Sequence, residues 1–114
     1  HNIIVIGDND EDMVKVVESL IEIGGGISLV KDQKVLGTLA HPIAGLMSDE
    51  PLESVHSQMS TLHEIAHSQL NVHRNIDPFM TLSFMALPVI PSYKLTDMGL
   101  FDVTTFSFVP LEID

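Results

Sequence analysis

The chain of 114 residues contains no cysteine and no tryptophan, and aromatic residues make up only 5% of it. Without cysteine there is no disulfide and no thiolate chemistry, which fits the reducing cytoplasm. Lys and Arg number 5 against 16 Asp and Glu, so the formal net charge is -11. A chain so poor in basic residues disfavours nucleic acid and anionic membrane surfaces as partners. No apolar run approaches the roughly 18 residues that a membrane-spanning helix needs.

The composition is that of a folded domain, with 45% apolar and 18% charged residues. Its length predicts one domain, spanning residues 1–114. The chain begins at His1 and Asn2 without a Met start, and the aliphatic run 3–6 follows at once. Such a run predicts a short strand that is buried on both faces. We therefore interpret the chain as a domain of a longer polypeptide.

Two segments have the periodicity of helices. Residues 10–21 begin with three acidic residues and repeat aliphatic side chains every three or four positions, which predicts a helix. The glycines at 24–26 are expected to end it. A second apolar stripe, from Leu52 to Leu70, predicts another helix with Ser48 or Asp49 as its N-cap.

The remaining apolar segments predict strands. Residues 27–30 and 35–39 are expected to form a β-hairpin with a tight turn between them. Apolar and polar residues alternate over 80–84, and residues 101–109 are rich in aromatic and β-branched side chains. Together these elements predict an α+β fold, in which two main helices pack in two layers on a mainly antiparallel sheet.

Two connecting segments are unusually apolar, namely residues 41–47 and the proline-flanked residues 87–90. Exposed loops are normally polar, because their backbone groups must meet water. We therefore expect these segments to contact a partner, either the rest of a longer chain or a second subunit.

Residues 63–67 fit the H-E-x-x-H pattern of zinc hydrolases. His63 and His67 would share a helix face and could reach one zinc ion, and Glu64 could take a proton from zinc-bound water. His73 follows at the spacing of a third ligand, but Leu70 stands where that class of protease has a glycine. One interpretation is thus a zinc-dependent hydrolase with ligands His63, His67 and His73 and with Glu64 as the base.

A structural interpretation of the same residues is favoured. On a helical wheel His56, His63 and His67 form a stripe beside the apolar face, whereas Glu64 lies nearly opposite that face. A catalytic glutamate should face a cleft, and this one is expected to point to water. We therefore expect a protonation-sensitive surface stripe or adventitious metal binding, and no functional metal or other cofactor in this chain.

Distinctive stretches occur in order along nearly the whole chain. They include PIAGLMS at 42–48 and DPFMTLSF at 77–84, with further stretches at 1–7, 9–13, 21–26, 87–91, 95–97, 99–100 and 102–103. Together they resemble the C-terminal domain of bacterial-type adenine deaminases, in the amidohydrolase superfamily. The resemblance is weakest over residues 52–76, which contain most of the histidines, so it lends no support to the zinc-hydrolase pattern.

The resemblance implies that the full enzyme hydrolyses adenine to hypoxanthine and ammonia, with a divalent metal (manganese, iron or zinc) in an upstream barrel. This chain would then be an inactive accessory domain that supports the missing N-terminal barrel or a homo-oligomer. His1 and Asn2 are the candidates for the side that faces the barrel. A third interpretation, from the residues alone, is a stand-alone module that binds a small ligand in its own pocket.

Overall fold

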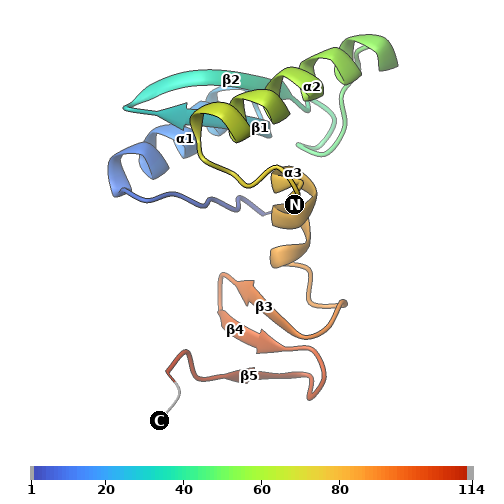
Figure 1. Cartoon of the computed structure of the whole chain (residues 1–114). Helices are drawn as coiled ribbons and strands as arrows, with labels where there is room; N and C mark the ends of the chain where they lie inside the picture. Colours follow the sequence, from blue (N-terminus) through green and yellow to red (C-terminus); the bar gives the residue numbers. More distant parts are fainter. Residues whose placement is uncertain (1, 113–114) are drawn as a thin grey trace.

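The computed structural model describes residues 2–112. In chain order its elements are α1 (Asp10–Glu22), β1 (Gly26–Lys31), β2 (Lys34–Ala40), α2 (Leu52–Gln69), α3 (Pro78–Met85), β3 (Tyr93–Thr96), β4 (Gly99–Asp102) and β5 (Ser107–Val109). The α+β class is confirmed, with the antiparallel strands divided between the sheet β1–β2 and the sheet β3–β4–β5. Figure 1 shows the second sheet set apart from the first, on the far side of α3. No helix within the described residues is long and apolar enough to cross a membrane.

Residues 9–40 form as the local signals predict. Asn9 caps α1 by accepting a hydrogen bond from the Asp12 N–H at 2.8 Å, and Gly24 follows the helix at a φ of 77°. Strands β1 and β2 pair antiparallel, with Lys31 opposite Lys34. The two residues between them, Asp32 and Gln33, both have positive φ, which is the type I′ geometry of tight hairpins.

The Asp12 side chain joins α1 to this hairpin turn. Its carboxylate accepts the backbone N–H of Gln33 at 2.7 Å and that of Asp32 at 3.0 Å. Hydrogen bonds to the ionised form, that from Gln33 above all, lower the pKa of Asp12 from its ordinary 3.8.

We predict that Asp12→Asn removes an acid-sensitive part of the stability. Because the folded-state pKa lies below the unfolded value of 3.8, the ionised carboxylate stabilises the fold above 3.8. That contribution is lost as the pH falls through the lower, folded value. At neutral pH the variant should have a lower free energy of unfolding than the parent. This difference in unfolding free energy should become smaller below about pH 4. Urea titrations across this range measure it, with the exposed Asp10→Asn as control, and a gap that does not change with pH would contradict the prediction.

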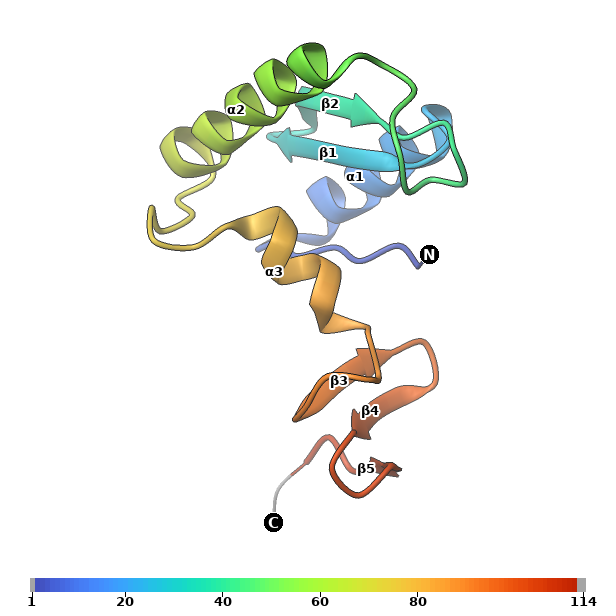
Figure 2. The same cartoon turned by 90° about the vertical axis from the view of Figure 1, so that its right-hand side faces the viewer.

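The two main helices lie on opposite faces of the β1–β2 hairpin. Ser28 in β1 shares a hydrogen bond of 2.8 Å with Ser19 of α1, whereas the next residue, Leu29, packs against Leu62 of α2. Neighbouring side chains of a strand point to opposite faces, so the hairpin lies between α1 and α2 (Figure 2). The expected two-layer packing is therefore corrected to three layers. A two-stranded sheet is about as wide as one helix and has room for one on each face.

The buried core is small. Within residues 2–112 the buried apolar side chains are Leu29, Leu39, Leu62 and Ala66. Many large apolar side chains are instead exposed, among them Ile3, Ile6, Ile43, Leu46, Met47, Leu52, Met98, Phe106, Phe108 and Leu111. The radius of gyration is 15.3 Å, against about 13 Å for a compact domain of this length. Much of the apolar content is thus surface, as expected of a domain that contacts a partner.

Two strand predictions are wrong. Residues 3–6 belong to no strand, since neither sheet within the described chain includes them. Residues 80–84 lie in α3, because Asp77 accepts the N–H groups of Phe79 and Met80 at 3.0 Å each and Pro78 occupies the first turn. These start signals outweigh the alternating pattern in so short a segment.

Two boundaries also differ from the prediction. The N-cap of α2 is Pro51 rather than Ser48 or Asp49, and the Ser48 hydroxyl instead accepts the Glu50 N–H at 3.1 Å in the turn before the helix. Residues 101–109 form two strands rather than one. The turn between them is held by Asp102, whose carboxylate accepts the N–H and hydroxyl of Thr104. The Thr104 hydroxyl is the largest of the causes that lower the pKa of Asp102.

Candidate functional site

The histidines of the H-E-x-x-H pattern share one face of α2, as their spacing predicts. The ring centroids of His63 and His67 are 6.1 Å apart. His63 Nε2 lies 3.7 Å from Asp77 Oδ2, and its ring meets Phe79 edge to face with the centroids 4.8 Å apart. His67 Nδ1 donates to the Val72 carbonyl at 3.0 Å. Both rings therefore tie α2 to the segment that leads into α3.

The other two residues of the proposed zinc site, Glu64 and His73, interact with residues outside the pattern. The Glu64 side chain is 62% exposed and forms an ion pair with Arg74 at 3.3 Å, which confirms that it points to water. His73 Nδ1 accepts the Asn75 N–H at 3.2 Å. In the part of the chain that the structure describes, no three His, Asp or Glu side chains are placed to hold a metal ion. This donor set does not fit a zinc centre, and sequence reasoning did not foresee the partners Arg74 and Asp77.

A large open cleft has a volume of ≈ 1050 Å³. Residues 2–8, β1, the inner side of α1 and α3 form its walls. The loop at 41–46 and the end of α2 also contribute residues to the lining. Asn2, a candidate for the barrel-facing side, is exposed and lies in the cleft lining. His1, the other candidate, lies outside the described residues. Sequence reasoning missed this cleft. The one sequence feature that indicates it is the run 3–6, whose composition is typical of a strand between two neighbouring strands.

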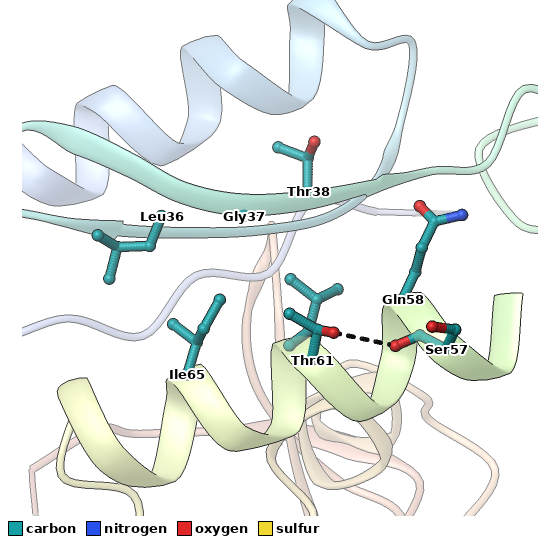
Figure 3. Close-up of a pocket in the computed structure, with 8 residues that line it drawn as sticks. Leu36, Gly37, Thr38, Ser57, Gln58, Thr61 and Ile65 are labelled. Carbon is teal, nitrogen blue, oxygen red and sulfur yellow. Dashed lines mark hydrogen bonds between the residues drawn. The ribbon is translucent and has the colours of Figure 1, made fainter. Parts of the chain in front are cut away.

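A smaller hollow of ≈ 170 Å³ lies between β2 and α2 (Figure 3). Its lining consists of Leu36, Gly37, Thr38, Ser57, Gln58, Thr61, Leu62 and Ile65, none of them charged. The Thr61 hydroxyl already donates to the Ser57 carbonyl at 3.1 Å. The volume is below the roughly 300–1,000 Å³ of typical small-molecule pockets. This hollow therefore gives little support to the stand-alone ligand-binding module.

Comparison with known proteins agrees with the resemblance seen in the sequence. The family model described as adenine deaminase C-terminal domain matches residues 1–107. Over 113 residues, 99% of this chain, it is 54% identical to adenine deaminase 2 of Carboxydothermus hydrogenoformans and 53% identical to adenine deaminase of Nitratidesulfovibrio vulgaris. It is 51% identical over 109 residues, 96% of the chain, to adenine deaminase of Clostridium acetobutylicum. The chain spans about a fifth of the length of these curated relatives, 20%, 20% and 19% respectively. On these matches, the chain belongs to the adenine deaminase C-terminal domain family.

Proposed function

We propose that the chain is the C-terminal accessory domain of a hydrolase of purine metabolism, which converts adenine and water to hypoxanthine and ammonia. The observation that carries the proposal is that relatives named adenine deaminase match almost the whole chain at about half identity. In this proposal the chain supports the rest of the enzyme and carries no chemistry itself. Its small core and exposed apolar surface support that role, since such surface in a soluble protein marks a contact.

The catalytic machinery is assigned to the part of the enzyme outside these 114 residues. The divalent metal implied by the resemblance, whether manganese, iron or zinc, belongs there as well, and no residue among 2–112 is assigned to it. His1 and Asn2 are proposed to face the catalytic barrel, and a homo-oligomer is proposed to use further apolar surface. The absence of cysteine favours a cytoplasmic enzyme, and the net charge of -11 favours one that binds neither nucleic acid nor membranes.

Adenine hydrolysis by the full-length enzyme tests this function. Ammonia release should require the full-length protein, and the same protein without these 114 residues should lose at least about tenfold in activity or fail to assemble. The 114-residue chain alone should release none. A full-length protein that leaves adenine unchanged would overturn the proposal. The barrel-facing assignment is tested separately by His1→Ala in the full-length enzyme, and unchanged adenine turnover would count against it.

Two titrations of the 114-residue chain separate the alternatives. If the chain were a zinc hydrolase, it would bind one tight equivalent of Zn²⁺ that His63→Ala abolishes and His56→Ala, on the same helix, retains. If it were a stand-alone binding module, adenine would raise its melting temperature by mass action. We expect no tight zinc site, because Glu64 is paired with Arg74. We expect no stabilisation by adenine, because the pocket between β2 and α2 is small and the open cleft of ≈ 1050 Å³ is assigned below to a protein segment.

A further inference from the structure

Within the described residues one edge of β1 has no neighbour, because β1 belongs to a two-stranded sheet and its other edge is bonded to β2. The ladder continues past the pair Gly26–Ala40, since His41 donates to the Gly25 carbonyl at 2.9 Å. Bonded and non-bonded pairs alternate along an antiparallel ladder. The N–H and C=O groups of Gly26 and Ser28 therefore point toward the free edge, where they can pair with another strand.

A second extended segment also lacks a neighbour. Residues 3–6 are four consecutive aliphatic residues outside any helix or strand, in the drawn-out stretch beside the N-terminus in Figure 2, and within residues 2–112 no backbone hydrogen bond joins them to another segment. Ile3 and Ile6 are 53% and 78% exposed. β-Branched side chains with unpaired backbone groups have the composition of a strand whose partner is missing.

The large cleft lies between these two segments. Every residue of 2–8 and every residue of β1 lines it, whereas no residue of β2 does. Consecutive rather than alternate residues line it, so the cleft meets the edges of both segments and not only one face. In Figure 2 residues 2–8 and β1 run in the same direction. The helix α1, which connects them in the chain, runs in the opposite direction. This is a β-α-β arrangement with a gap where a strand would complete the sheet.

We propose that the cleft is a strand-insertion site, in which an extended apolar segment of the same enzyme pairs with the free edge of β1 and with residues 3–6. The inference rests on the proposed function, because the segment comes from the part of the enzyme outside these 114 residues. The chain covers only 20% of the length of its relatives, so most of the polypeptide is available to supply it.

The lining of the cleft defines the chemistry of the inserted segment. Apolar side chains reach the cleft from α1, including Met13 and Val16, and from α3, including Phe79 and Leu82. A strand enclosed in this way should be aliphatic on both faces and uncharged. A second copy of this chain is a poorer occupant, because each copy carries a net charge of -11.

Hydrogen–deuterium exchange of the full-length enzyme tests the insertion, with adenine hydrolysis measured on the same sample. The amides of residues 4–6, Gly26 and Ser28 should exchange at least about 100-fold more slowly than unstructured amides, at every protein concentration. Fast exchange in an enzyme that hydrolyses adenine would overturn the insertion and leave the proposed function standing. Slow exchange that is lost on dilution would identify a second copy as the occupant and also overturn it. Slow exchange without adenine hydrolysis would overturn the proposed function alone.

A matched pair of variants locates the effect at the cleft. Ile6 and Leu52 are each 78% exposed in this chain, but only Ile6 lines the cleft. In the full-length enzyme Ile6→Ser should speed exchange at Val5 and Ser28 at least about tenfold, whereas Leu52→Ser should leave both rates unchanged. Equal rates in the two variants would contradict the insertion.

Discussion

The Leu39→Ala variant is expected to lose about 2–5 kcal/mol of unfolding free energy. Leu39 in β2 is only 1% exposed, and it packs in a cluster of buried side chains with Leu29, Leu62 and Ala66. Truncation removes the apolar contacts of the leucine and leaves a cavity, because α2 is held in place by its other contacts and closes the space only in part. With total stabilities of about 5–15 kcal/mol, such a loss leaves little net stability for a domain with so small a core.

Urea unfolding of the 114-residue chain measures this loss, followed by far-ultraviolet circular dichroism. The matched control is Val35→Ala on the same strand, because Val35 is 45% exposed. The control should change the unfolding free energy by less than about 1 kcal/mol, since little apolar area leaves water at that position. Similar losses in the two variants would show that the buried cluster is not what stabilises the fold.

The elements that sequence reasoning placed correctly are those whose signals are local. Helix α1 follows from the Asn9 cap, its acidic first turn and the glycines after it, and the β1–β2 hairpin follows from two apolar runs around a short turn. The H-E-x-x-H spacing likewise placed His63 and His67 on one face of α2. Each of these depends on residues only a few positions apart, so the sequence contains the whole cause.

Most of the features that sequence reasoning missed depend on contacts between distant residues. The helix α3 is an exception, because the alternation at 80–84 predicts a strand while the local start signal of Asp77 and Pro78 begins a helix. The run 3–6 was expected to pair, and its composition is that of a buried strand, yet the described chain provides no neighbour. In the same way, the pairing of Glu64 with Arg74 is set by how the chain turns after α2. Local patterns report which face of an element is apolar, and they do not report what covers it.

The Gly26→Ala variant should be destabilised by at least about 3 kcal/mol. Gly26 begins β1 at a φ of 136°, a conformation that residues with a side chain rarely adopt. A Cβ atom there would lie 2.1 Å from the Leu39 carbonyl oxygen and 3.0 Å from the His41 nitrogen. Both are backbone atoms of the β1–β2 ladder, so they cannot move aside without breaking the pairing that places Leu39 in the core.

The neighbouring Gly24→Ala variant separates the clash from the cost of the backbone conformation. Gly24 also has a positive φ, 77°, but a Cβ atom there would meet nothing within 4 Å. Its replacement should cost about 1–2 kcal/mol, the usual penalty of left-handed backbone for a residue with a side chain. Thermal unfolding of both variants measures the difference. If Gly26→Ala cost no more than Gly24→Ala, the contact between the start of β1 and the end of β2 would be looser than the structure has it. The free edge of β1 would then not be held rigidly enough to receive another strand.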